Sequence, residues 1–191
     1  MPDCLAMPGA FSPPLRTSRL VLREIVEGDL EAHGRLFADP EVVRYLYDTE
    51  MSPEQLRVHF SRRLWHGAPV QGEWCNLAVE HQGAYVGEAG LSLASSEHRC
   101  YEVGYVFSRT SWGSGFATEA TGALVDAAFR DCGAHRVVAR LDARNDASRR
   151  VLERLGMRRE AHLVRNEFVK GEWTDELIYA VLEVEWKWPR Q

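Results

Sequence analysis

The sequence has no long hydrophobic run, no paired-cysteine motif and no excess of basic residues. No stretch approaches the roughly 20 apolar residues of a membrane helix, and no basic segment followed by an apolar run marks a signal peptide. The net charge is −5, from 23 basic and 28 acidic residues, so the basic surface that nucleic acids attract is missing. We therefore expect a cytoplasmic protein that binds neither membranes nor nucleic acid.

Cysteines are few and scattered. Cys4, Cys75, Cys100 and Cys132 show neither CxxC nor zinc-ligand spacing. Because thiols stay reduced in the cytosol, we expect free cysteines and no bound metal.

The composition is typical of a single globular domain. The 191 residues are 45% hydrophobic and 27% charged, which is enough to bury a full core. Residues 1–14 contain several prolines and little periodicity, which predicts a flexible N-terminal tail. We expect residues 15–191 to form one domain.

A glycine-rich turn is the most informative segment. The sequence WGSGFATEA, residues 112–120, joins a strand-like run at 101–107 to a helix-like run at 116–131. The first amides of a helix lack intrahelical partners, and the helix dipole favours an anion there, so this junction can bind a phosphate group. The segment is neither a dinucleotide fingerprint nor a P-loop, and by itself it is also compatible with a simple tight turn.

The other periodic segments predict a mixed α/β domain with a mostly antiparallel sheet. Helices are expected at 29–37, 52–66, 116–131 and 147–155, and strands at 19–23, 74–80, 84–93, 101–107, 135–141, 157–169 and 175–185. Two of the helices are crossovers in the second half of the chain.

These motifs together resemble the GNAT superfamily of acyl-CoA N-acyltransferases, in particular its ribosomal-protein N-terminal (Rim-type) acetyltransferase branch. The matching segments are residues 17–23 (TSRLVLR), 102–105 (EVGY), 112–120 (WGSGFATEA), 135–137 (HRV), 145–157 (NDASRRVLERLGM) and 171–175 (GEWTD). The resemblance implies a GNAT-like α/β (α+β) fold, with a twisted, mostly antiparallel sheet flanked by helices and a splayed pair of central strands. It also implies acetyl-CoA as the co-substrate.

The resemblance assigns the residues that hold acetyl-CoA. The implied pyrophosphate loop is Trp112, Gly113, Ser114, Gly115, Phe116, Ala117 and Thr118. Trp112 stands where the superfamily pattern has Gln or Arg, which removes a polar side chain but keeps the amides. Tyr105, Val106 and Phe107 are expected to lend backbone groups to the pantetheine arm, and Asn145 to bind it.

The catalytic residues also follow from the resemblance. Ser148 stands where many members carry a tyrosine acid, and we expect it to protonate the leaving sulfur. Glu167 and Glu102 are the two candidates for the general base, with Glu167 slightly ahead. On the residues alone, a helix cap at Asn145, an ordinary first-turn residue at Ser148 and solvated strand residues at both carboxylates are the favoured interpretations, and for Asn145 and Ser148 the resemblance reverses this order.

The resulting hypothesis is direct transfer of an acetyl group to a primary amine, either a protein N-terminus or a small molecule. An alternative is a non-catalytic acyl-CoA-binding or sensory domain on the same fold. A plain nucleotide-binding module is a third interpretation. Exposed C-terminal strands that can pair between subunits allow a homodimer.

Overall fold

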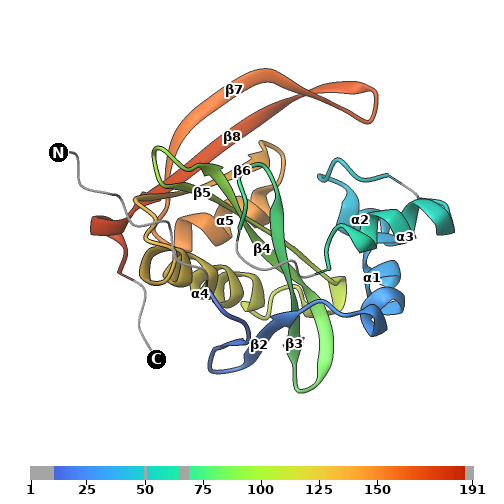
Figure 1. Cartoon of the computed structure of the whole chain (residues 1–191). Coiled ribbons are helices and arrows are strands. Elements are labelled where there is room, and N and C mark those ends of the chain that lie inside the picture. Colours follow the sequence, from blue (N-terminus) through green and yellow to red (C-terminus); the bar gives the residue numbers. More distant parts are fainter. Residues whose placement is uncertain (1–10, 50, 65–68, 188–191) are drawn as a thin grey trace.

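The computed structural model describes residues 11–49, 51–64 and 69–187. They form an eight-stranded sheet in the order β1-β2-β3-β4-β5-β6-β8-β7 (Figure 1). The strands are β1 (Leu15–Arg16), β2 (Leu20–Glu24), β3 (Trp74–His81), β4 (Ala84–Ser95), β5 (Cys100–Phe107), β6 (Arg136–Asp142), β7 (Arg158–Val169) and β8 (Glu172–Leu182). Every neighbouring pair is antiparallel except β5 with β6. The predicted mixed, mostly antiparallel sheet is therefore confirmed.

The helices are α1 (Leu30–Phe37), α2 (Pro40–Val43), α3 (Pro53–Ser61), α4 (Phe116–Arg130) and α5 (Asp146–Arg154). α3 begins as its sequence predicts, because Ser52 and Gln55 cap each other's backbone amides and Pro53 occupies the first turn. It ends at Ser61 and not at the expected His66, which lies outside the described residues. α2 was not predicted.

The two faces of the sheet carry different helices. In β3, Leu77 and Val79 belong to the main core with α4, whereas Ala78 packs with Phe60 of α3. This alternation is the two-residue period of a strand. Figure 1 shows α4 and α5 on one side of the sheet and α1–α3 grouped at the other end of the molecule, beyond β4.

The predicted tail is corrected at its C-terminal end. Residues 1–10 lie outside the described part of the chain, but Phe11 is 1% exposed and belongs to the main core. The next residues lead into β1, which pairs with β2. An aromatic side chain between prolines gave no periodic signal, so its burial could not be inferred from the sequence.

The second strand of the C-terminal hairpin lies three residues earlier than expected. β8 begins at Glu172, directly after the predicted turn at Lys170 and Gly171, and ends at Leu182, where a 3-10 turn begins. Cys100 and Cys132 are free thiols, as predicted, and Cys4 lies outside the described residues. No helix in the described ranges is long and apolar enough to cross a membrane.

The parallel pair β5 and β6 separates along its length. Pairing runs from Cys100 with Arg136 to Glu102 with Val138 and then stops. Beyond these residues β5 continues to Phe107 and β6 to Asp142 without pairing to each other. The expected splay between central strands is therefore present, and it opens a cavity in the middle of the sheet.

Candidate active site

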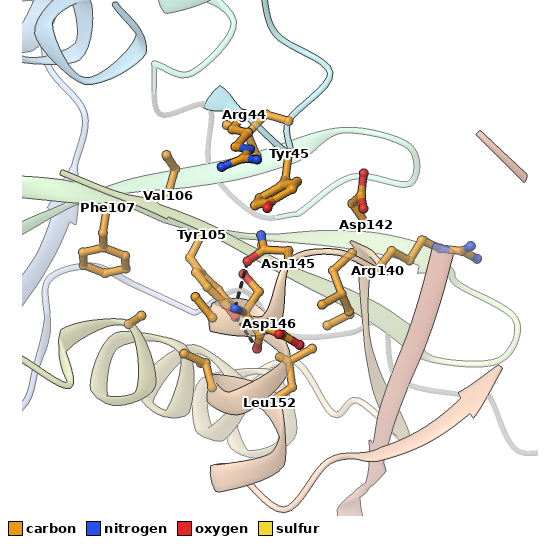
Figure 2. A pocket seen from close by; sticks show the side chains of 18 of the residues that line it. Arg44, Tyr45, Tyr105, Val106, Phe107, Arg140, Asp142, Asn145, Asp146 and Leu152 are labelled. Atoms are coloured by element: carbon orange, nitrogen blue, oxygen red, sulfur yellow. Dashed lines mark hydrogen bonds between the residues drawn. The ribbon is translucent and has the colours of Figure 1, made fainter. Parts of the chain in front are cut away.

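A cavity of about 890 Å³ occupies the splay between β5 and β6. The glycine turn, the start of α4 and the first turn of α5 line one part of it, and residues 44–47, β7 and β8 line another. In Figure 2, Arg44 and Tyr45 lie on one side of the cavity, and Tyr105 and Asn145 lie opposite them. The cavity is therefore shared by segments that are distant in the sequence.

The glycine turn has the backbone geometry of an anion site. Gly113 and Gly115 have φ values of 77° and 81°, in the left-handed region that glycine adopts without strain. Gly115 is the N-cap of α4 and has no side chain to satisfy the amides that follow it. The first intrahelical bond begins at the Glu119 amide, so the preceding amides of Phe116 to Thr118 remain available to a ligand.

The other polar groups of the turn are partly committed. The indole of Trp112 donates to the carbonyl of Phe107 at 2.9 Å, which fixes the turn against the end of β5. Ser114 departs from the expectation, because its amide bonds to the Ser111 carbonyl at 3.4 Å and it does not line the cavity. In contrast, the buried hydroxyl of Thr118 has no partner. An orphaned hydroxyl beside free helix amides fits a pyrophosphate group.

An ion pair braces this turn from the other side. Arg19 pairs with Glu119 in the first turn of α4 at 2.6 Å and donates to the Ser114 carbonyl at 2.9 Å. Glu119 also accepts hydrogen bonds from Thr17 at 2.6 Å and from the Arg19 amide at 2.9 Å. The resembling segments at 17–23 and 112–120 are therefore in direct contact.

The first turn of α5 contains the predicted proton donor. Asn145 caps the helix by accepting from the Ser148 amide at 3.1 Å, and both residues line the cavity. The phenol of Tyr105 on β5 donates to the Ser148 carbonyl at 3.3 Å. Burial raises the pKa of Tyr105 to about 12, opposed by a hydrogen bond with Ser148. Tyr105 and Ser148 are thus joined by a hydrogen bond at the wall of the cavity.

Glu102 lies in the cavity beside an arginine. Arg140 on β6 is 3.7 Å from Glu102 and 3.3 Å from Glu176 on β8. Burial and the charge of Glu176 raise the pKa of Glu102, and Arg140 opposes this rise. The two carboxylates therefore share one cation.

Glu167 has a different environment. It is half-buried on β7, lines the cavity and accepts from Asn166 at 3.2 Å. Tyr47 faces it from the segment after α2. Although Tyr47 is largely exposed, desolvation of its phenol and the carboxylates of Glu167, Glu176 and Glu102 raise its pKa. No arginine pairs with Glu167 among the described residues, so its charge is not already neutralised by a cation.

The cavity brings together nearly all of the predicted residues. Those that line it are Glu102, Tyr105, Val106, Phe107, Trp112, Gly113, Gly115, Phe116, Ala117, Thr118, Asn145, Ser148 and Glu167. Sequence reasoning missed Tyr47, Arg140 and Glu176. Glu176 shares a strand face with Thr174, and both are buried in the structure, but this burial follows from strand pairing and not from a local sequence pattern.

Two other polar residues are accounted for by local pairs. Arg149 is half-buried and bonds with Asp146 at 2.8 Å and with Glu153 at 3.2 Å on its own helix. His162 pairs with Asp175 at 2.7 Å across the β7–β8 hairpin, on its exposed part. Arg150, unlike its neighbour, lines the cavity.

Comparison with known proteins agrees with this geometry. The family described as the acetyltransferase (GNAT) domain matches residues 19–158. The uncharacterized N-acetyltransferase YnaD of Bacillus subtilis is 28% identical over 172 residues, which cover 90% of this chain and 98% of YnaD. A GNAT-family acetyltransferase structure from Bacillus anthracis is 30% identical with a TM-score of 0.80, over 90% of this chain and 99% of that one.

A more distant structure shares the fold. The spermidine N-acetyltransferase of Vibrio cholerae, solved in complex with CoA and spermine, is 22% identical with a TM-score of 0.76, over 88% of this chain and 98% of that one. The family match covers most of the chain. The chain therefore belongs to the GNAT family and is an acetyl-CoA-dependent acetyltransferase.

Proposed function

We propose that the protein transfers the acetyl group of acetyl-CoA directly to a primary amine, in a complex that holds both substrates at once. The observation that carries this proposal is the continuity of one cavity. Free helix amides and the orphaned Thr118 hydroxyl lie at one part of it, and Glu102 and Glu167 at another. A donor and an acceptor can therefore meet in the splay between β5 and β6.

Gly113 and residues 115–118 are the proposed site of the CoA pyrophosphate, where backbone N–H groups and the helix dipole favour negative charge. Tyr105, Val106 and Phe107 are the proposed contacts of the pantetheine arm. Their strand has no pairing partner on the β6 side beyond Glu102, so its free backbone groups can bond the amides of the arm.

The proposed acid–base pair is Glu167 and Ser148. An amine is protonated at neutral pH and must lose a proton before it attacks the thioester carbonyl. Glu167 is favoured as the base because no arginine pairs with it in the described residues, whereas Arg140 lies 3.7 Å from Glu102 and competes with an incoming ammonium group for that carboxylate. Ser148 is the proposed proton donor to the departing sulfur, directly or through a water molecule, with Tyr105 holding it in place.

The chemical class of the acceptor is proposed from the negative charge of the cavity. Glu102, Glu167 and Glu176 line the same part of the cavity and attract a cation. This arrangement is compatible with a polyamine, of the kind bound by the Vibrio cholerae neighbour, or with another cationic amine or a peptide N-terminus.

An acetyl-CoA consumption assay tests the proposal. Thiol release is followed with a panel of polyamines, aminoglycosides, amino acids and peptides with free N-termini. The expected result is saturable release with at least one class, reduced in Glu167→Gln and Ser148→Ala. The proposal fails if no amine raises release above the uncatalysed rate while calorimetry still detects CoA binding.

A further inference from the structure

A buried polar network lies under α1 and α3, outside the cavity. His33 on α1 is fully buried, and Glu88 on β4 is 1% exposed. The His33 Nδ1 atom is 2.5 Å from a carboxylate oxygen of Glu88. Tyr85 donates to the same oxygen, and Arg63 donates to the other at 3.1 Å. Four ionisable groups are therefore packed together where the proposed chemistry does not need them.

The network continues toward the cavity through a second histidine. The Nε2 atom of His33 is 2.9 Å from Nδ1 of His59 on α3. The Nε2 atom of His59 is in turn 3.3 Å from a carboxylate oxygen of Asp48. Phe37 packs against both imidazole rings, with ring centroids 4.6 Å apart in each case. The chain of contacts thus runs from a buried glutamate to a residue beside the cavity.

Asp48 and Arg63 compete for the Nε2 atom of His59, at the end of this series of contacts. Besides Asp48, the Nη2 atom of Arg63 lies 3.0 Å from Nε2 of His59. A carboxylate requires an N–H at this nitrogen, whereas a guanidinium requires a lone pair. One protonation state of the histidine pair therefore satisfies Asp48, and the other satisfies Arg63.

Glu88, at the buried end of this series of contacts, determines how many protons the two histidines carry. Burial would raise the pKa of Glu88, but hydrogen bonds from His33 and Tyr85 and the charge of Arg63 hold it below its usual value. Glu88 is thus a carboxylate, and His33 Nδ1 must carry a proton to donate to it. The contact between the two histidines needs one further proton.

With only these two protons, Nε2 of His59 has a lone pair that accepts from Arg63 and repels Asp48. With a third proton, shared by the two imidazoles, Nε2 carries an N–H that donates to Asp48. The contact to Asp48 is therefore made by the protonated pair.

Asp48 ends a segment that faces the acceptor part of the cavity. Tyr45 and Tyr47 of this segment line the cavity, and Tyr47 lies beside Glu167. A second anchor comes from the β7–β8 turn, where Lys170 donates to the Val43 carbonyl at 2.6 Å. Lys170 is also the remaining charged group that acts on Asp48, besides His59 and Arg63. Loss of the His59 contact therefore removes the only anchor that the described residues place on the Asp48 side chain by a hydrogen-bond or ion-pair contact, while Leu46 stays packed in the cluster of Leu36, Phe37 and Val43.

We propose that His33 and His59 are positioning residues that share one proton, and that this proton fixes residues 44–48 against the acceptor part of the cavity. When the pair is protonated, Asp48 is held and Tyr45 and Tyr47 are in place. When the pair loses the proton, Arg63 takes its nitrogen and the segment is released. The consequence for acceptor binding rests on the proposed function, whereas the structural switch does not.

Hydrogen–deuterium exchange of residues 44–48 tests the switch without any substrate. It is measured from about pH 5.5 to about pH 8.5, the range in which histidine titrates, and corrected for the intrinsic pH dependence of exchange. Across this range we expect roughly twofold to fivefold weaker protection as the pH rises, as the loss of a partly exposed ion pair allows. Imidazole resonances of His33 and His59 should shift together over the same interval.

Two variants separate a proton switch from a merely structural network. Asp48→Asn keeps the segment anchored in both states, because an amide can accept from or donate to His59, so the pH step should disappear. His59→Gln removes the titration and should also abolish the step, whereas the exposed control His98→Gln should keep it. A step that persists in Asp48→Asn, or protection that does not vary with pH in the parent protein, overturns the proposal.

A kinetic measurement then addresses the acceptor. For any amine that the acetylation panel identifies, KM for the amine should rise with pH over the exchange interval in the parent and not in Asp48→Asn, with KM for acetyl-CoA unchanged in both. If the exchange step is present and no amine is acetylated, the proposed function fails while the switch stands. If an amine is acetylated and the exchange step is absent, the reverse holds.

Discussion

The phenol of Tyr105 donates a hydrogen bond to the backbone carbonyl of Ser148 at 3.3 Å, which joins a splayed central strand to the first turn of α5. Burial raises the pKa of Tyr105 to about 12, and Ser148 opposes this rise. A serine hydroxyl alone is a weak acid. A neighbouring phenol that holds its position makes the proton transfer to sulfur geometrically reproducible.

Ser148→Ala should lower kcat for acetyl transfer by about 100-fold, the lower end of what a positioned proton donor supplies. Dissociation of CoA, measured by calorimetry, should change little because the glycine turn is untouched. Tyr105→Phe should lower kcat by a smaller factor.

The double variant tells whether the two residues act as a unit. If Tyr105 works by holding Ser148, the combined loss should be close to that of Ser148→Ala alone and far from the product of the two. Multiplicative losses would assign Tyr105 a role independent of Ser148.

Glu167→Gln should reduce kcat/KM for the amine by about 100-fold, as expected for removal of a general base. Glu102→Gln is the matched comparison, since both residues line the cavity and the substitution has the same size. The Glu102→Gln variant should lose less activity than Glu167→Gln, because the Glu102 carboxylate is paired with Arg140 at 3.7 Å. A larger loss in Glu102→Gln than in Glu167→Gln would reverse the assignment of the base.

Glu102→Gln should in addition change stability in a defined direction. Burial and Glu176 raise the pKa of Glu102 in the folded protein, so the folded state binds more protons than the unfolded state. The protonated form of Glu102 therefore stabilises the folded state at low pH, and this contribution is lost as the pH rises through the raised pKa. The variant should therefore unfold at a higher denaturant concentration than the parent at pH 7, and this gain should vanish at acidic pH.

Local signals were sufficient for one part of the site and insufficient for the other. The cap at Asn145 and the turn at Gly113 and Gly115 could be predicted because their chemistry is encoded by adjacent residues. The acceptor part is assembled from residues 44–48, β6 and β8, which meet only after the sheet forms. Arg140 and Glu176 lie 36 positions apart and come together through strand pairing, a relationship that no local pattern shows.

Glu119→Gln should destabilise the protein by about 1.5–3 kcal/mol at pH 7, the range for hydrogen bonds to a charged group. Burial raises the pKa of Glu119, but hydrogen bonds from Thr17 and Arg19 more than offset it, so the pKa is lowered. A carboxylate with a lowered pKa contributes stability above its unfolded pKa, and this is lost as the pH falls through the folded value. The parent and the variant should therefore converge in acid.

Urea unfolding at several pH values measures this difference. Glu31→Gln is a suitable control, because its ion pair with Arg35 on α1 is exposed on both sides and should contribute little. Equal destabilisation by the two substitutions would show that the contacts between residues 17–19 and α4 contribute no more to stability than an exposed ion pair does.

Gly115→Ala should weaken CoA binding, whereas Gly133→Ala should not. Both glycines have positive φ values, 81° and 64°, so each substitution should cost roughly 1–2 kcal/mol of stability through backbone strain. The surroundings differ, because an added Cβ at Gly115 would lie 3.4 Å from the Arg19 guanidinium, while at Gly133 nothing lies within 4 Å. Gly115 also precedes the free amides of α4, whereas Gly133 follows the other end of that helix, at a position that does not line the cavity.

Calorimetric titration of CoA, compared at equal fractions of folded protein, should therefore show a loss of affinity in Gly115→Ala alone. Parallel losses in both variants would mean that the effect arises from destabilisation of α4 and not from the amide cradle.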